Sequence, residues 1–220
     1  MVKNIKQTKN SVKHPDQRVG VFIDVQNMYY SAKNLYGAKV NFGNIVKEAV
    51  AGRKLIRAIA YVVRTEEKQE QPFFDALYNL GIETKERPLQ IFQGGEKKAD
   101  WDVGITVDAI RVSPSIDTII LVSGDGDYIP LVEYLRNQGK QVEVAAFGGT
   151  TSSKLVDVVD DFIDLGEDKA KFLIADYRKK QPIRKSLTKP AGGKINNKIV
   201  PRKAVKEVVS KKPDFGFNNK

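Results

Sequence analysis

Residues 117–139 read DTIILVSGDGDYIPLVEYLRNQG, and this stretch decides the class of fold. It begins with a short run of apolar, mostly β-branched residues, which predicts a buried strand over 117–124. A tight acidic turn follows, and then a helix over 127–139 that ends at Gly139. A buried strand that leads directly into a helix is the repeating unit of an α/β domain with a parallel sheet.

The same alternation of strands and helices continues on both sides of this unit. Further strands are predicted over 18–24, 54–63, 82–92 and 140–148. Helices are predicted over 27–37, 41–52, 66–81, 99–112 and 150–165, the last followed by a short final strand. The strands are apolar on both sides, so we expect an open, mostly parallel sheet with helices on both faces. We place this domain at residues 18–166.

Charge is distributed unevenly along the chain. The formal net charge is +10, but residues 169–220 carry +13 and residues 1–19 carry +4, which leaves −7 for the middle. Basic segments of this kind bind polyanions, most commonly nucleic acid. We therefore predict a basic N-terminal arm (1–17) and a basic, flexible tail (167–220). The acidic residues of the last predicted helix read as a solvated face: Asp157, Asp160, Asp161 and Asp164.

Composition excludes several classes of site. The chain has no cysteine, so disulfides, zinc–thiolate centres and thiol catalysis are excluded. Its one histidine, His14, lies outside the predicted domain, which argues against histidine triads and histidine metal clusters. No apolar run approaches the roughly 20 residues of a membrane helix, and the N-terminus lacks the apolar core of a secretory signal. We expect a cytoplasmic protein with no membrane partner.

Two predicted strands end in aspartate. Asp24 closes the first strand, and Asp125 and Asp127 follow the strand of the opening stretch. Ligands of open α/β sheets gather at the carboxyl ends of strands, where the strand order reverses. If these two strands are neighbours, their aspartates share one crevice, and Gly124 and Gly126 let the backbone turn tightly there. Each aspartate reads equally well as a cap of the helix that follows it.

The helix over 99–112 offers further carboxylates. Asp100 and Asp102 stand in its first turn. Asp108 lies six residues after Asp102, about 240° around the helix axis, so the two cannot share a face. We assign Asp108 at best a supporting role behind the ligands, and Asp100 reads as an N-cap or as a similar supporting group.

Carboxylates gathered in one crevice require a counter-charge. Two of them about 4 Å apart repel by about 1 kcal/mol in water and by several at an effective dielectric near 20. Oxygen ligands without histidine or cysteine suit Mg²⁺ or Mn²⁺. We therefore predict a metal ion held by Asp24, Asp102 and Asp125. Such ions contact phosphate oxygens and lower the pKa of water, as hydrolysis of a phosphodiester requires.

Other polar residues near these strand ends are candidate substrate contacts. Asn27 either caps the first helix or orients a phosphate, and Thr151 opens a helix whose amides and hydroxyls either cap it or receive a phosphate. Ser123 precedes the acidic turn, and Lys97 and Lys98 precede the acidic helix. We expect these five residues to contact the substrate.

Four segments together resemble the NYN-domain family, in particular its LabA-like branch. They are VFIDVQNMYYSAK, KKADWDVGITVDAI, LVSGDGDYIPLVEYLRNQG and VEVAAFGGTTSSKLVDVVDDFIDL, in this order within residues 18–166. The resemblance implies a PIN-like fold and metal-dependent cleavage of RNA, most readily single-stranded RNA. Motif by motif, it implies a catalytic site built from Asp24 with Asn27, Asp102 with Asp108 as its later partner, and Asp125 with Asp127.

Two rival functions are weighed against a ribonuclease. Phosphatases of the haloacid-dehalogenase type need an acid two residues after a nucleophilic aspartate, and Gln26 stands two residues after Asp24. The other rival is an RNA-binding or regulatory PIN-like module with little or no cleavage, and the sequence leaves it open. The choice of RNA rests on the resemblance and on the basic segments. A homodimer is compatible with this fold.

Overall fold

One six-stranded parallel sheet organises the chain. The computed structural model describes residues 11–64, 71–88, 90–91, 97–98 and 100–174, with the backbone alone at 90–91 and 97–98. The strand order is β4-β3-β1-β7-β8-β9, and every neighbouring pair is parallel. The bounds are β1 Arg18–Asp24, β3 Lys54–Arg64, β4 Glu83–Pro88, β7 Thr118–Val122, β8 Gln141–Ala146 and β9 Asp161–Asp164.

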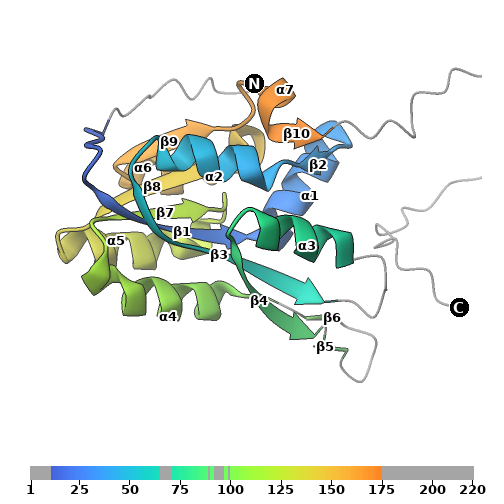
Figure 1. The fold of residues 1–220 in the computed structure, drawn as a ribbon, viewed down its shortest axis with the longest axis horizontal. Helices are drawn as coiled ribbons and strands as arrows, with labels where there is room; N and C mark the ends of the chain where they lie inside the picture. Colours follow the sequence, from blue (N-terminus) through green and yellow to red (C-terminus); the bar gives the residue numbers. More distant parts are fainter. Residues whose placement is uncertain (1–10, 65–70, 89, 92–96, 99, 175–220) are drawn as a thin grey trace, which may run out of the picture. The chain divides into compact units, whose positions relative to one another are not determined.

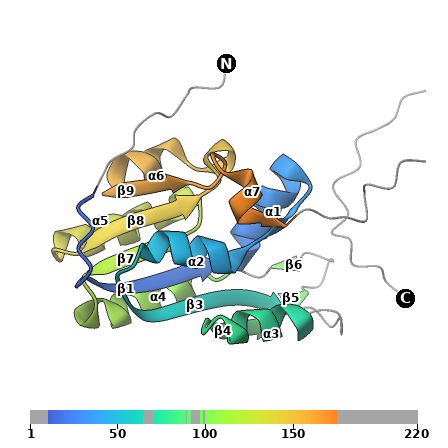
Figure 2. The same ribbon diagram turned by 45° about the horizontal axis from the view of Figure 1, so that its top comes forward.

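Helices cover both faces of the sheet, as predicted. In Figure 1, α2 (Phe42–Val50) lies above the sheet, whereas α4 (Asp102–Val112) and α5 (Ile129–Asn137) lie below it. Figure 2 shows α2 in front of the strands and α4 behind them. The other helices are α1 (Val25–Tyr36), α3 (Gln71–Asn79), α6 (Ser153–Val158) and α7 (Lys169–Phe172), with 3₁₀ turns η2 (Ser113–Ser115), η3 (Gly126–Tyr128) and η4 (Gly148–Thr150).

The central strands explain why the sequence shows no alternation there. All five residues of β7 are buried, and β1 is buried from Val19 onward. Because both faces are covered, each position must be apolar or small. Gly20 is an example, since a Cβ at this position would lie 2.6 Å from Cδ1 of Ile116. None of the described helices combines the length and the apolar character that a membrane span requires.

Strand order reverses between β1 and β7. From β1 the chain adds β3 and then β4 on one side, while β7, β8 and β9 extend the sheet on the other side. Ile23 of β1 is paired with Val122 of β7. The residues that follow these two strands therefore emerge next to each other, at the position where such sheets bind ligands.

The domain continues beyond the predicted boundary at residue 166. α7 is followed by β10 (Leu173–Ile174), which pairs antiparallel with β2 (Lys39–Val40). Phe172 is buried, and the side-chain amide of Asn44 donates to the carbonyl oxygen of Lys171 at 2.7 Å. The predicted flexible tail is therefore wrong for residues 169–174, because the buried ring of Phe172 and the hydrogen bond from Asn44 attach them to the domain. Residues 175–220 lie outside the described part.

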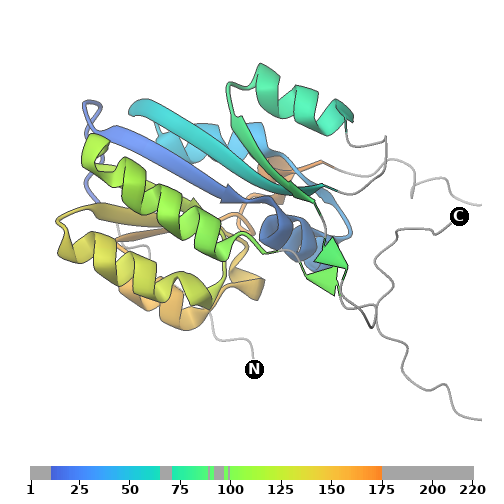
Figure 3. The same cartoon turned by 90° about the horizontal axis from the view of Figure 1, so that it is seen from below.

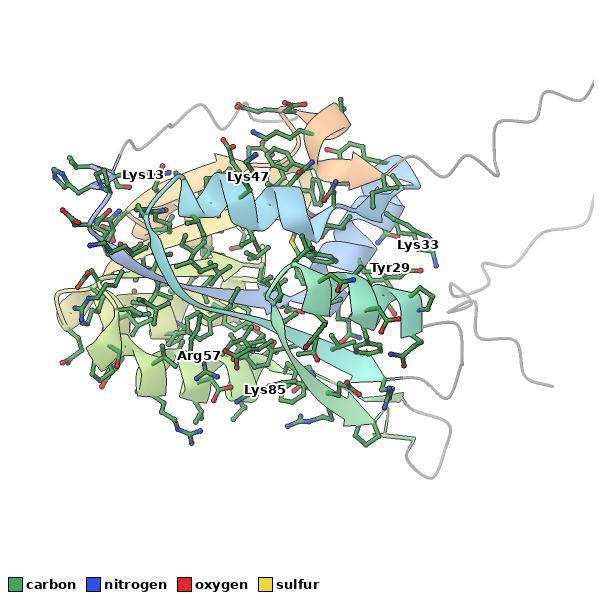
Figure 4. All side chains as sticks on the ribbon, viewed as in Figure 1. Lys13, Tyr29, Lys33, Lys47, Arg57 and Lys85 are labelled. Atoms are coloured by element: carbon green, nitrogen blue, oxygen red, sulfur yellow. The ribbon has the colours of Figure 1, made fainter. Side chains whose placement is uncertain are left out.

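Part of the predicted N-terminal arm also packs against the domain. Lys13 Nζ lies 2.9 Å from Asp161, and the Gln17 side chain donates to that of Gln141 at 2.9 Å. Figure 4 shows Lys13 on the side of the sheet where the strands begin. Residues 1–10 of this arm lie outside the described ranges.

The predicted helix over 150–165 is wrong in its second half. α6 ends at Val158, and β9 then pairs with β8. The predicted solvated face is wrong for Asp161 and Asp164, whereas Asp157 is exposed on α6. Asp161 is buried beside Lys13, and Asp164 accepts from the backbone N–H groups of Gly148 and Gly166. Pairing with the sheet satisfies the backbone of 161–164, which the local sequence alone does not reveal.

Candidate metal centre

Asn27 joins the ends of β1 and β7. Asp24 caps α1 by accepting a hydrogen bond from the backbone N–H of Asn27 at 3.0 Å. The side-chain oxygen of Asn27 in turn accepts from the backbone N–H of Gly124 at 3.0 Å. Asp24 thus takes the capping role that the sequence left open. The side chain of Asn27 caps no helix here and instead holds the acidic turn against α1.

The acidic turn is compact because two glycines allow it. A Cβ on Gly124 would lie 2.8 Å from the Thr151 hydroxyl, and one on Gly126 would lie 2.9 Å from the Ser152 hydroxyl. Within the turn, Asp125 accepts from the backbone N–H of Asp127 at 3.0 Å. Larger side chains would push the turn away from the loop before α6.

Thr151 and Ser123 contribute to this turn from within the protein. The Thr151 hydroxyl donates to the carbonyl oxygen of Phe147 at 2.9 Å. Ser123 is buried, and its hydroxyl accepts from the backbone N–H of Asp125 at 3.3 Å. Both contacts are structural, so a contact of either residue with substrate stays a prediction.

A clamp around Trp101 fixes the start of α4. The indole N–H donates to the carbonyl oxygen of Val62 at 3.0 Å. Arg87 donates to the carbonyl oxygen of Asp100 at 2.8 Å, and its guanidinium carbon lies 4.6 Å from the centre of the Trp101 ring. Gly104 leaves room for the indole, because a Cβ there would lie 2.5 Å from Cε3 of Trp101. The clamp therefore determines where Asp102, the next residue, enters the crevice.

Three carboxylates meet at this edge of the sheet. One oxygen each of Asp102, Asp125 and Asp127 lies within 4.8 Å of the other two. Asp102 and Asp125 are half-buried and Asp127 is exposed. Among the described residues, no lysine or arginine forms an ion pair with any of the three. Hard oxygen donors at this spacing, open to solvent and without an ion pair to a described lysine or arginine, fit Mg²⁺ or Mn²⁺.

Asp24 lies next to this trio rather than within it. Its carboxylate is 8% exposed, and Oδ2 lies 3.4 Å from the Tyr128 hydroxyl. The same hydroxyl donates to Oδ1 of Asp102 at 3.0 Å. The metal set predicted from the sequence, Asp24, Asp102 and Asp125, therefore differs from the observed trio in one member, with Asp127 in the place of Asp24.

The pKa values of two carboxyls at the crevice, Asp24 and Asp102, are raised. Burial raises the pKa of Asp24 to about 6, and the charges of Asp102 and Asp125 add to the increase. The hydrogen bond from the backbone N–H of Asn27 opposes this increase only in part. Burial likewise raises the pKa of Asp102, and the charge of Asp125 acts in the same direction. A bound cation would reverse both effects because it stabilises the ionised forms.

Tyr128 is the residue that sequence reasoning missed. It is buried, and burial together with the charges of Asp24 and Asp102 raises the pKa of its phenol, which therefore stays a donor. One signal could have identified it. A tyrosine directly after the acidic turn, in the first turn of a core helix, must bury its ring and find a partner for its hydroxyl.

Asp108 has partners of its own, away from the trio. It accepts from Lys85 Nζ at 2.6 Å and from the Tyr61 hydroxyl at 2.8 Å. Burial alone would raise the pKa of Asp108, but these two hydrogen bonds outweigh it and the pKa is lowered. Figure 4 shows Lys85 on β4, beside α4. Asp108 therefore links α4 to β3 and β4, and a role behind the metal ligands stays a prediction.

The remaining predicted contacts are less well defined. The charge of Asp100 acts on Asp102, which agrees with a place at the rim of the crevice. The backbone at Lys97 and Lys98 forms β6 (Lys97–Lys98), which pairs with β5 (Gln90–Ile91). The side chains of these two lysines lie outside the described part, so their contact with phosphate stays a prediction.

A doubly wound parallel sheet with carboxylates at its switch point defines a PIN-like α/β domain. Residues 18–166 match the NYN domain, and the chain belongs to this family. NYN domains are generally nucleases. The family and fold predicted from the sequence are thus confirmed.

Three similar proteins extend this finding. The chain is 28% identical over 159 residues to the low amplitude and bright protein LabA of Synechococcus elongatus, covering 68% of this chain and 84% of LabA. It is 29% identical over 160 residues to the uncharacterised protein MJ0482 of Methanocaldococcus jannaschii, covering 70% of this chain but 57% of that protein. The crystal structure of VPA0982, a protein of unknown function from Vibrio parahaemolyticus, has a TM-score of 0.67 at 32% identity and covers 74% of this chain and 100% of that one.

Proposed function

We propose that the chain is a metal-dependent ribonuclease that hydrolyses phosphodiester bonds at the acidic crevice. The observation that carries this proposal is the trio Asp102, Asp125 and Asp127, which lies at the switch point and pairs with no described lysine or arginine. Uncompensated negative charge would repel a nucleic acid, so a site of this kind needs a cation before RNA can bind. The nuclease character of the family supports the same reading.

The ion, Mg²⁺ or Mn²⁺, would be held by Asp102, Asp125 and Asp127. A fourth carboxylate, that of Asp24, lies beside the Tyr128 hydroxyl. Such an ion supplies positive charge to phosphate oxygens and lowers the pKa of water. The protein's own groups orient the ligands. Tyr128 holds Asp102 through its hydroxyl, and Asn27 holds the acidic turn against α1.

RNA is the substrate class that the basic segments support. Residues 169–220 carry a net charge of +13, whereas residues 20–168 carry −7. Positive segments attached to an acidic domain raise the local concentration of a polyanion near the crevice. Their effect on affinity should decrease as salt increases, because counterion release drives such binding.

The test incubates a labelled single-stranded RNA with the protein and Mg²⁺ or Mn²⁺. We expect cleavage that EDTA stops. The Asp125→Asn variant should lose more than about 100-fold in cleavage rate, because changes to residues that only support metal ligands typically cost about 10- to 100-fold. Asp75→Asn is the matched control, since Asp75 is exposed on α3 and bonds to Gln71. Equal binding of wild type and variant with no cleavage under either metal would favour the RNA-binding module. Equal cleavage by both would contradict the assigned site.

A further inference from the structure

The outward face of α4 carries an apolar stripe. Val103, Val107 and Ile110 are 72%, 45% and 36% exposed. They stand at positions i, i+4 and i+7, which lie on one side of a helix. Single exposed apolar residues are ordinary on protein surfaces, but three in one helical stripe form a contiguous patch of the kind that marks an interface.

The opposite face of α4 is apolar as well, and it already has a partner. Ile105, Ala109 and Val112 are buried in the core. A helix with apolar residues on two opposite faces is normally covered on both. Figure 3 shows α4 at the front of its face of the molecule, with no described element in front of it. The neighbouring helix α5 differs, because Glu133, Arg136 and Asn137 stand among its exposed residues.

Charge along α4 indicates what covers the stripe. Its beginning is acidic, because Asp100 lies just before α4 and Asp102, whose carboxylate faces the crevice, is its first residue. Its last turn carries Arg111, whose side chain is 72% exposed. Within the described part of the chain, the ion pair of Arg111 is a long one, 3.5 Å to Asp108 in the same helix. An antiparallel copy of α4 would place Arg111 of each chain near the acidic start of the other, whereas a parallel copy would oppose like charges. The antiparallel arrangement also aligns the helix dipoles favourably.

The spacing of the stripe fits a two-fold axis. Val107 is the central residue of α4, which runs from Asp102 to Val112. With the axis at Val107, Val103 of one chain faces Arg111 of the other. The aliphatic part of the arginine side chain can then cover the valine, while its guanidinium reaches the acidic start of the partner's α4. Two-fold contacts of this isologous type are the commonest way in which identical chains associate.

We propose that the protein forms a homodimer through antiparallel contact of α4 with α4 of a second copy, centred on Val107. The partner is a second copy of this chain because α4 is self-complementary in charge and its stripe is centred on one residue. Dimerisation through α4 does not require metal at the crevice.

A single cysteine provides the sharpest test. The natural chain has none, so Val107→Cys introduces the only thiol, and the proposed axis brings two such thiols together. Mild oxidation with copper phenanthroline should convert this variant to a disulfide-linked dimer. Tyr78→Cys is the matched control, because Tyr78 on α3 is 82% exposed and therefore more open to chance collisions. Equal or faster cross-linking of the control would overturn the proposal.

Sedimentation equilibrium supplies an independent readout. We expect a dimeric wild type, a Val107→Glu variant whose dimer dissociation constant rises at least tenfold, and a Tyr78→Glu variant that behaves as wild type. Circular dichroism would verify that each variant is folded, as expected for exposed positions. A wild type that stays monomeric at all concentrations would contradict the proposal and would favour a different protein as the partner of the stripe. A dimer that Val107→Glu does not weaken would equally exclude α4 as the interface.

Discussion

The hydroxyl of Tyr128 lies 3.0 Å from Oδ1 of Asp102 and 3.4 Å from Oδ2 of Asp24, so one phenol connects a carboxylate of the crevice to a buried one. A phenol has a single proton and can donate to one carboxylate at a time. The shorter distance assigns that proton to Asp102. Asp24, when protonated, can donate to the phenol oxygen in turn.

The first prediction follows from this contact. Tyr128→Phe keeps the buried ring and removes only the hydroxyl, so we expect a folded protein in which Asp102 is no longer oriented. Mn²⁺ affinity, measured by isothermal titration calorimetry, should fall by about 10- to 100-fold, the usual effect of losing a group that orients a metal ligand. An unchanged affinity would show that Tyr128 acts only as a core residue. Tyr61→Phe is the control, since Tyr61 is equally buried but bonds to Asp108.

The second prediction concerns the dependence of stability on pH. In the folded protein the pKa of Asp24 is about 6, compared with its ordinary value of 3.8. Between these values the folded state keeps a proton that the unfolded state has lost, so the free energy of unfolding decreases as pH rises from about 4 to about 6. Asp24→Asn removes this loss and still offers an amide oxygen to the backbone N–H of Asn27.

Without divalent ions, this variant should therefore gain stability relative to wild type by about 2 kcal/mol between pH 4 and pH 7. Urea titrations at unit steps from pH 4 to pH 8 measure the difference. If the difference in unfolding free energy between the two proteins does not widen as pH rises, the pKa of Asp24 is not raised in the folded protein.

The third prediction tests the clamp at the start of α4. Gly104→Ala improves intrinsic helix propensity by about 1 kcal/mol, but its Cβ would lie 2.5 Å from the Trp101 ring. Overpacking of this kind typically destabilises by about 1–3 kcal/mol, and it should also displace Asp102 and weaken Mn²⁺ binding. Thr106→Ala on the same helix is the control for propensity. A Gly104→Ala protein that is more stable and binds metal normally would refute the clamp.

The fourth prediction concerns a buried ion pair far from the crevice. Arg53 and Glu143 are both fully buried, and the guanidinium contacts the two carboxylate oxygens at 2.7 and 2.9 Å. Arg53→Met would leave the buried Glu143 with only Lys13, 3.8 Å away, as a counter-charge, and should cost about 3–5 kcal/mol of unfolding free energy. Adding Glu143→Gln should restore much of that loss. Chemical denaturation of the two variants measures both effects, and equal losses would argue against charge burial as the cause.

The sequence predicted the sheet and its switch point because buried parallel strands are continuously apolar. The strands that end at Asp24 and before Ser123 could be identified from composition alone. The region after residue 150 could not, since its valines and aspartates fit a helix and an edge strand equally well. Only pairing of β9 with β8 and the contact of Lys13 with Asp161 decide between them, and both depend on the folded chain.

The candidate site was predictable to a similar degree. Strand ends and helix starts predicted Asp24, Asp102, Asp125 and Asp127 in one region. The structure brings together Asp102, Asp125 and Asp127, with Asp24 beside them. The depth of each side chain depends on packing, so Asp24 could not be distinguished from Asp127 as a member of the trio. Tyr128 was missed for the same reason, because its role depends on where a hydroxyl lies within the core.

The most direct test of the central claim is the anomalous scattering of crystals soaked in Mn²⁺. The account predicts one or more peaks in contact with Asp102, Asp125 and Asp127. The distance from each ion to its carboxylate oxygens should be about 2.0–2.2 Å, as is typical of small divalent ions. It also predicts that crystals of Asp125→Asn lose the peak. A wild-type crystal with no peak at the three carboxylates, or with a lysine or arginine lying between them, would contradict the account.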